Sequence, residues 1–210
     1  MTRIAAYESF KERLMTGELK PGQFVTQREL ATLAGVPLSI AREAIQKLQH
    51  ETLLKVHPQR GIQITDITTR FIREAFQIRK ILEKDAVRNF AENHQEEAQS
   101  LLEESCILLS SAEKEVSDEI LERAIEVDWR MHDLIIEKMN NSLLTEIYQV
   151  NATRLRLIRV NIRFSAERVL GALSEHVEIL ECCARGDADS ADNAVTNHIN
   201  TALRRAIDGA

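Results

Sequence analysis

The stretch VTQRELATLAGVPLSIAREAIQKLQHE, residues 25–51, predicts two helices joined by a tight turn. Thr26, followed three residues later by Glu29, is the pattern of a capping box, in which each side chain accepts a hydrogen bond from the other residue's backbone N–H. Gly35 ends the first helix, and the second begins at Pro37. The apolar positions of the second helix recur at helical spacing: Ile40, Ala44, Ile45 and Leu48. These four side chains are expected to face inward.

The sequence on either side of this stretch completes a winged helix-turn-helix. Upstream, RIAAYESFKERLMTGEL (3–19) has apolar residues at helical spacing, and KPGQ (20–23) breaks that helix. Downstream, the apolar runs LLKVH (53–57) and GIQIT (61–65) are joined by PQR and predict a β-hairpin. In such a fold the third helix enters the DNA major groove, and the hairpin tip touches the adjacent backbone or minor groove.

The remainder of the chain has a helical pattern throughout. No proline lies beyond Pro58, which suits long uninterrupted helices. Six helices are predicted, with approximate bounds 68–93, 95–112, 118–139, 142–163, 165–185 and 187–206. Thr68 or Thr69 can cap the first of them, and the short connections favour an antiparallel six-helix bundle. We therefore expect a mainly α chain, with a DNA-binding domain over 1–66 and an all-helical domain over 67–210.

The composition is that of an ordinary core-forming protein, but its charge is unevenly divided. Of its residues, 44% are hydrophobic and 29% are charged. Residues 1–66 hold nine Lys+Arg against seven Asp+Glu, a net charge of +2, and the remainder holds eighteen against twenty-six, a net charge of -8, which together give the -6 of the chain. Only the N-terminal part is thus suited to approach a polyanion.

The sequence predicts a cytoplasmic protein with no membrane partner. It lacks an apolar run of about 18 residues, so no transmembrane helix is expected. The N-terminus, MTRIAAYESFKERL, is charged and amphipathic, unlike a signal peptide. The cysteines, Cys106, Cys182 and Cys183, are odd in number and are interpreted as reduced thiols.

Four residues of the helical domain are expected at one level of the bundle. Asp128 and His132 stand one turn apart on the same helix face. Counting residues to each turn, at a rise of about 1.5 Å per residue, places His176 and His198 at the height of Asp128. Three imidazoles and one carboxylate suit a divalent transition ion such as Zn, Ni or Mn. Because height does not fix direction, a metal site and a buried His–Asp hydrogen-bond network remain alternatives.

These patterns resemble the GntR family of transcription regulators, FadR subfamily, in which a winged helix-turn-helix precedes a ligand-binding FCD domain. GELKPGQFVTQRELATLAGV (17–36) is similar to the family's G.L.PG..L.E..LA..LGV, and AREAIQKLQHETLL (41–54) is similar to its VREAL..L..EGLV. VDWRMHDLIIEKMNNSLL (127–144) resembles D..FH..L....N..L, and EHVEILECCARGDADSADNAVTNHI (175–199) resembles EH..I..A...GD...A......H. The resemblance covers nearly the whole chain.

The resemblance implies a ligand set for a metal ion. In metal-containing members, the Asp and His of the D..FH pattern, the His of the EH motif and the His of the final helix bind a divalent ion. These roles carry over onto Asp128, His132, His176 and His198. Zinc is the first expectation, ahead of nickel and manganese, and the family's acyl-CoA-binding branch lacks such a set. Effectors of the metal branch are typically small organic acids whose carboxylate reaches the ion.

The resemblance also implies DNA contacts through arginines of the RELA segment, the VREAL segment and the wing. The matching positions are Arg28, Arg42, Arg60 and Gly61. A planar guanidinium can engage guanine or phosphate, although each arginine can equally be a solvated surface residue. Where the family usually has SRTPVRE, this chain has PLSIARE, so Pro37 and Leu38 replace Ser-Arg and Ser39 must help the remaining contacts. The EG pair before the wing is likewise changed, to Glu51-Thr52.

Effector contacts are expected from three residues of the helical domain. Arg79 matches an arginine recurrent in the family and can pair with an effector carboxylate. It can instead form a salt bridge with Glu83, four residues on. Asn151 and Arg154 lie at the height of Asp128 on the intervening helix.

The leading hypothesis is a homodimeric transcription factor, a repressor, whose binding to a pseudo-palindromic DNA operator responds to a small carboxylate. Two alternatives stay open. An Asp/His₃ site can activate water, making the bundle a metallo-hydrolase fused to a DNA-binding domain, although neither Glu126 nor Glu175 is placed as its base by a catalytic motif. The metal can also be purely structural. We expect no catalytic residues.

Overall fold

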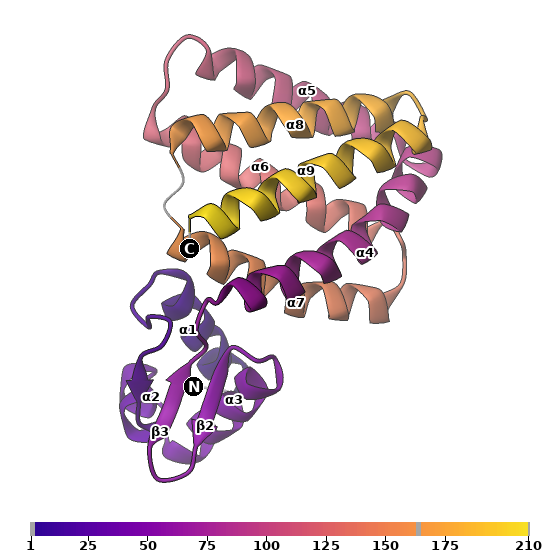
Figure 1. Ribbon diagram of the computed structural model, residues 1–210. Coiled ribbons are helices and arrows are strands. Elements are labelled where there is room, and N and C mark those ends of the chain that lie inside the picture. Colours follow the sequence, from indigo (N-terminus) through magenta and orange to yellow (C-terminus); the bar gives the residue numbers. More distant parts are fainter. Residues whose placement is uncertain (1–2, 163–164, 210) are drawn as a thin grey trace. The chain divides into compact units, whose positions relative to one another are not determined.

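The computed structural model describes residues 3–162 and 165–209 (Figure 1). Contacts between residues divide this chain into two units. One unit contains the residues up to Ile72 together with Ala152–Ile162, and the other contains Arg73–Asn151 together with the last two helices. Helix α7, Ser142–Asn161, therefore contributes to both units.

The first unit is a winged helix-turn-helix, as predicted. Its elements are α1 (Arg3–Met15), β1 (Phe24–Val25), α2 (Gln27–Leu33), α3 (Leu38–His50), β2 (Leu54–His57) and β3 (Gly61–Ile64). The strands form an antiparallel sheet in the order β1-β3-β2, in which Val25 and Val56 both pair with Ile62 of the central strand. The sequence predicted the β2–β3 hairpin but not β1, because two residues are too few to show a period of two.

Local hydrogen bonds explain where the helices of this unit begin. The Thr26 hydroxyl accepts from the backbone N–H of Glu29 at 3.1 Å, and the Glu29 carboxylate accepts from the backbone N–H of Thr26 at 2.6 Å, which confirms the capping box. On α3 the inward positions differ slightly from expectation. Ala41 is fully buried, whereas Ile40 is only partly buried at the edge of the core. The remaining positions expected to face inward, Ala44, Ile45 and Leu48, are buried.

One residue between α3 and the wing has an unusual backbone. Thr52, which stands where the family pattern has glycine, takes φ +61°, a left-handed conformation that disfavours β-branched side chains. Its carbonyl oxygen accepts a hydrogen bond from the Thr65 hydroxyl at 2.7 Å, which helps to hold this turn. The departure noticed in the sequence is therefore also a strained position in the structure.

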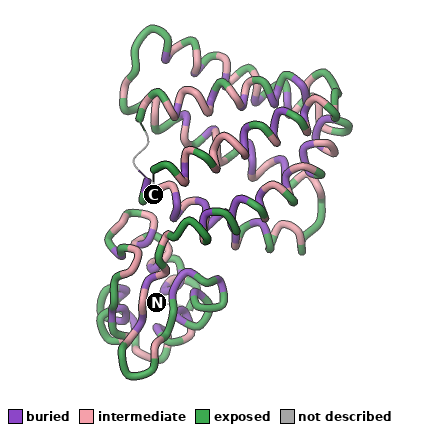
Figure 2. Tube along the Cα trace, in the orientation of Figure 1, coloured by how far each residue is buried: buried purple, intermediate pink, exposed green. Residues whose placement is uncertain are grey.

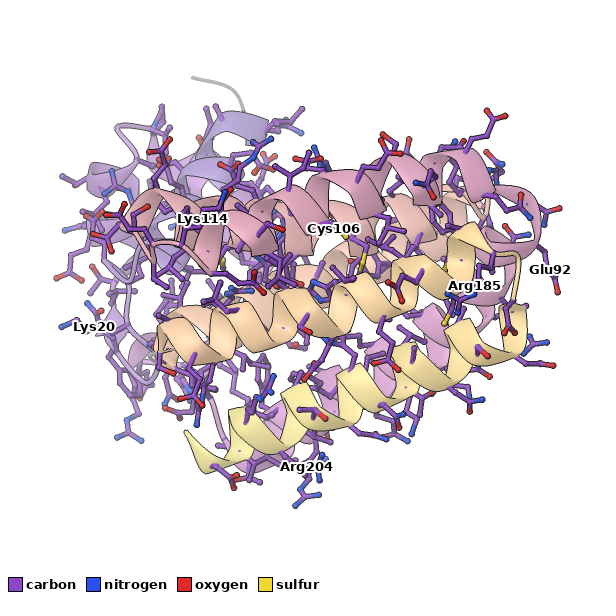
Figure 3. The ribbon with its side chains drawn as sticks, turned by 90° about the horizontal axis from the view of Figure 1, so that it is seen from above. Lys20, Glu92, Cys106, Lys114, Arg185 and Arg204 are labelled. Carbon is purple, nitrogen blue, oxygen red and sulfur yellow. The ribbon has the colours of Figure 1, made fainter. Side chains whose placement is uncertain are left out.

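The second unit confirms the predicted helices to within a few residues at each end. They are α4 (Thr69–Asn93), α5 (Gln95–Ala112), α6 (Asp118–Glu137), the first half of α7, α8 (Ala166–Ala184) and α9 (Ala188–Asp208). The Thr68 hydroxyl caps α4 by accepting from the backbone N–H of Phe71 at 3.1 Å. Helix α8 packs against α5, α6 and α9 (Figure 1). Seen from above, α8 and α9 run side by side, and Arg204 points away from them (Figure 3).

Polar contacts join the C-terminal half of α4 to the first turns of α9. Lys84 pairs with Asp192 at 3.3 Å, and Arg88 pairs with Asp189 at 2.7 Å. Buried residues follow the inner faces of the helices, with exposed residues outside them (Figure 2). The cysteines carry free thiols. No helix in the described part of the chain is both long enough and apolar enough to cross a membrane.

The backbone of the wing generates a first prediction. Gly61 takes φ +100°, and a Cβ added there would lie 2.9 Å from the carbonyl oxygen of Val25. Gly35 takes φ +62°, but an added Cβ would meet no atom within 4 Å. We expect Gly61→Ala to lower the free energy of unfolding by about 2–3 kcal/mol and Gly35→Ala by about 1 kcal/mol. Chemical denaturation of the full chain measures both, and equal losses would contradict the role of the close contact.

Candidate metal centre

Four polar side chains meet inside the helical unit. Helix α6 contributes Asp128 and His132, α8 contributes His176, and α9 contributes His198. One potential ligand atom from each residue lies within 4.8 Å of the others. The imidazoles are buried, and the Asp128 side chain is 14% exposed. The structure thus brings together the four residues that the sequence placed at one height.

The atoms that converge are the Nε2 atoms of the imidazoles and Oδ1 of Asp128. Oδ1 lies 3.5 Å from His132 Nε2 and 3.4 Å from His176 Nε2. His176 Nε2 lies 3.3 Å from His198 Nε2. Nitrogen and carboxylate oxygen atoms in this arrangement are a donor set that zinc and related divalent ions accept. The residues present therefore fit a divalent transition ion.

Two carboxylates face the opposite edge of the imidazoles. Glu83 Oε2 lies 2.8 Å from His132 Nδ1, although the alignment is poorer than in an ideal hydrogen bond. Glu175 Oε2 lies 2.8 Å from His198 Nδ1. A carboxylate at Nδ1 keeps the proton on that atom and leaves the Nε2 lone pair free, which is the usual arrangement around a metal-binding histidine. His176 Nδ1 has no hydrogen-bond partner among the described residues.

The contacts of Glu83 and Glu175 with the imidazoles were not predicted from the sequence. Glu83 was predicted only as a partner of Arg79, and Glu175 was considered only as a base that no catalytic motif places. The available signals were weak, since Glu83 stands one turn after Arg79 and Glu175 directly precedes His176. Neither spacing says which imidazole edge a carboxylate from another helix will face.

The environment holds two of the imidazoles neutral. Burial lowers the pKa of His176 and of His198 well below the usual value for histidine. For His132, burial and the Arg79 charge act in the same lowering direction, but Glu83 and Asp128 outweigh them and raise the pKa. Burial also acts to raise the pKa of Glu83, yet Arg79 and His132 lower it to about 2. Neutral imidazole is the form that a metal binds.

Arg79 also reaches into the cluster. Its Nε donates to Glu83 Oε1 at 2.9 Å, so the salt bridge considered from the sequence is formed. Its Nη2 lies 2.5 Å from His132 Nε2 and 3.5 Å from His198 Nε2. The same guanidinium therefore contacts a buried carboxylate and two of the converging nitrogen atoms.

The other two residues considered for effector contact lie in different surroundings. Asn151 is buried and donates from Nδ2 to the carbonyl oxygen of Ala75 at 2.9 Å, while its Oδ1 has no partner among the described residues. The structure does not bring Arg154 into the cluster. Its guanidinium donates to the carbonyl oxygen of Glu51 at 3.2 and 3.1 Å, within the other unit. The position of Arg154 along helix α7 could be counted from the sequence, but the direction of its side chain around the helix could not.

The candidate DNA-binding residues belong to the winged helix-turn-helix. Arg28 lies on α2, and Ser39 and Arg42 lie on α3, all with exposed side chains. Arg42 donates to the side chain of Gln27 at 3.0 Å. Arg60 is exposed at the tip of the hairpin, 5.9 Å from the centre of the Phe24 ring. Gly61 follows it, and the Val25 carbonyl oxygen leaves no room there for a side chain.

Neither acidic residue considered as a hydrolytic base is free in this structure. Glu126 is exposed and pairs with Arg123 at 3.1 Å. Glu175 contacts His198 and pairs with Arg205 at 3.1 Å. A general base must be within reach of the water that it activates, so both engagements weigh against a hydrolase.

Comparison with known proteins finds matches to two domain families. Residues 2–64 match the bacterial regulatory proteins of the gntR family, and residues 74–201 match the FCD domain. The HTH-type transcriptional regulator YdhC of Bacillus subtilis is 27% identical over 92% of this chain and 86% of its own length. The HTH-type transcriptional repressor RspR of Escherichia coli is 24% identical over 86% of this chain and 78% of its own.

Solved structures share the fold. E. coli McbR/YncC superimposes with a TM-score of 0.76 at 21% identity, over 98% of this chain and 97% of that one. A structure described as the Zn²⁺-bound FCD domain of TM0439 covers 68% of this chain and 95% of its own, with a TM-score of 0.51 at 22% identity.

The buried Glu83 carboxylate generates the next prediction. Glu83→Gln leaves the buried Arg79 charge without its partner, so we expect a loss of about 3 kcal/mol in the free energy of unfolding of the metal-free protein. Asp189→Asn removes a carboxylate from the exposed pair with Arg88 and should cost less than about 1 kcal/mol. Denaturant titration compares the two variants, and similar losses would contradict the importance of the buried pair.

The loss of stability in Glu83→Gln should depend on pH. Because the pKa of Glu83 falls from its usual 4.5 to about 2 in the folded protein, its carboxylate stabilises the fold at neutral pH. That contribution is lost as the pH falls from about 4.5 to about 2. The difference in unfolding free energy between wild type and Glu83→Gln should therefore shrink across this range, whereas a constant difference would argue against it.

Proposed function

The chain belongs to the GntR family of bacterial transcription regulators that carry an FCD domain, and on that premise we propose that it is a repressor controlled by a small carboxylate at a divalent metal ion. The observation that carries the proposal is the convergence of Asp128, His132, His176 and His198 in the FCD domain. We place the DNA-binding domain at 1–66 and the metal- and effector-binding domain at 67–210.

The proposed metal is zinc, with nickel and manganese as alternatives. Support comes from the donor set, from the neutral state of His176 and His198, and from the carboxylates behind His132 and His198. The related FCD domain of TM0439 is described as Zn²⁺-bound. A bound ion would supply a Lewis-acid position for an effector oxygen.

The proposed effector is a small organic acid. Arg79 is the residue best suited to hold its carboxylate, because a guanidinium offers paired donors and this one lies at the edge of the metal ligands. Asn151 offers a hydrogen-bond acceptor, since its buried Oδ1 lacks a partner among the described residues, and it would suit a hydroxyl group of the acid rather than the carboxylate. Arg154 is the weakest of the three, because it is bonded to Glu51.

The proposed target is a pseudo-palindromic operator bound by a homodimer in the cytoplasm. Arg28, Ser39 and Arg42 are exposed on the helix-turn-helix, and Arg60 is exposed on the wing. Arginine at these positions can engage phosphate or guanine, and two copies would read two half-sites. An effector would change operator affinity only through its differential affinity for the DNA-competent and the incompetent arrangement.

One observation favours a second candidate role for the metal. The imidazoles are at most 4% exposed, so an ion held by them would be sealed within the bundle. Such burial also suits a purely structural metal that serves the stability of the helical domain. The two roles differ in one measurable respect, because only an effector site couples acid binding to operator affinity.

Metal binding provides the first test. We expect His176→Ala to weaken Zn²⁺ binding by more than about 100-fold, because it removes a ligand from the centre of the bundle. His94→Ala is the matched control, since His94 lies outside the cluster and faces Glu97 at 3.5 Å. Metal analysis after dialysis measures both variants. Unchanged metal content in His176→Ala would refute the site.

Operator binding provides the second test. Gel-shift assays with the region upstream of the protein's own gene should show specific binding that a particular organic acid weakens. Arg42→Ala should lose about 1–3 kcal/mol of binding free energy, whereas Arg123→Ala, in the helical unit, should lose none. If specific binding survives but every acid tested is without effect, the metal is structural. If the protein binds no DNA sequence specifically, the repressor proposal is wrong.

A further inference from the structure

Arg79 places a positive charge among the proposed metal ligands. Its Nη2 lies 2.5 Å from His132 Nε2 and 3.5 Å from His198 Nε2, so one guanidinium nitrogen faces two of the four converging atoms. Because a guanidinium can only donate, a hydrogen bond from Arg79 at these contacts requires an Nε2 atom that carries a lone pair. That is the same tautomer that a metal requires.

The guanidinium is also anchored outside the cluster. Its Nε donates to Glu83 Oε1 at 2.9 Å, and both side chains are almost completely buried. A buried charge is costly without its partner, so the Nε–Glu83 bond is the contact that Arg79 must keep. A pivot of the whole planar guanidinium about the Nε–H···Oε1 axis would move Nη2 away from the imidazoles while that bond persists.

The charges around the cluster explain why a metal ion and the Arg79 guanidinium would exclude each other beside Nε2 of His132 and of His198. In the state in which all three imidazoles are neutral and can bind a metal, Asp128, Glu83 and Arg79 sum to a single negative charge. A divalent ion changes this sum to a single positive charge and meets Arg79 at the same nitrogen atoms, where like charges repel strongly because the imidazoles and the guanidinium are buried. One carboxylate would then neutralise the centre.

We propose, on the basis of the metal-dependent function above, that the Arg79 guanidinium fills the cation position of the metal-free centre and competes with the metal for His132 and His198. Metal binding displaces it and turns it into the group that receives a single carboxylate. Metal and carboxylate therefore bind with positive coupling, each raising the affinity of the other.

The test measures Zn²⁺ affinity of the full chain by competition with a chromophoric chelator. Arg79→Met should bind Zn²⁺ at least about tenfold more tightly than wild type, because the competing charge is gone. Arg88→Met is the matched control, since it removes a charge from the same helix at the exposed pair with Asp189. Its affinity should equal that of wild type. Equal or weaker binding by Arg79→Met would overturn the competition.

Measuring Zn²⁺ affinity with and without acetate tests the carboxylate-receiving role of Arg79 separately from its competition with the metal. It should tighten Zn²⁺ binding to wild type and to Arg88→Met but not to Arg79→Met. Acetate tightening in Arg79→Met equal to that in wild type would overturn the receiving role of Arg79. If neither wild type nor Arg79→Met binds Zn²⁺, the metal itself is removed from the proposed function, which distinguishes that failure from a failure of the competition alone.

A measurement on the unaltered protein covers the case in which Arg79→Met does not fold. The side-chain Nε–H resonance of Arg79, assigned by its loss in Arg79→Lys, is followed by NMR during titration with Zn²⁺. It should shift up to one equivalent while the resonance of Arg88 stays in place. A stationary Arg79 resonance in a protein that binds Zn²⁺ would overturn the displacement.

Discussion

The buried carboxylate of Glu83 is the group on which the centre of the helical unit depends. It bonds Arg79 on its own helix and faces His132 on α6, so it fixes two cationic or potentially cationic groups at once. Because buried charge is tolerated only when it is paired, neither partner can turn away without a large loss of stability. The contact of Glu83 with His132 Nδ1 places the opposite edge of that ring, with its Nε2, toward the other converging atoms.

Much of this architecture follows from the sequence, and what does not has identifiable physical reasons. Long helices repeat their apolar spacing over many turns, so their bounds could be predicted, and the rise per residue then brought Asp128, His176 and His198 to one height. Direction around a helix depends on packing partners from elsewhere in the chain. For that reason the second contact of Glu83 and the bonding of Arg154 to Glu51 could not be predicted from spacing.

Four residues that can ligate a metal do not by themselves make a site that a metal can enter. A metal needs neutral imidazoles, and burial provides that condition for His176 and His198. The same burial leaves the imidazoles little exposed to solvent, and Arg79 lies against Nε2 of His132. Under the proposed displacement, the free energy of metal binding includes the cost of moving the charged Arg79 side chain as well as the gain from the metal–ligand bonds.

Thr52 has a consequence for how the wing meets DNA. Glycine at this joint would adopt the positive φ freely and would allow the hairpin to hinge against α3. Threonine reaches the same angle only within a narrow range, and its carbonyl oxygen is held by Thr65. The chain thus accepts local strain for a stiffer joint. With α3 and the wing contacting an operator as proposed, a joint of fixed angle would favour operators whose grooves already match that angle.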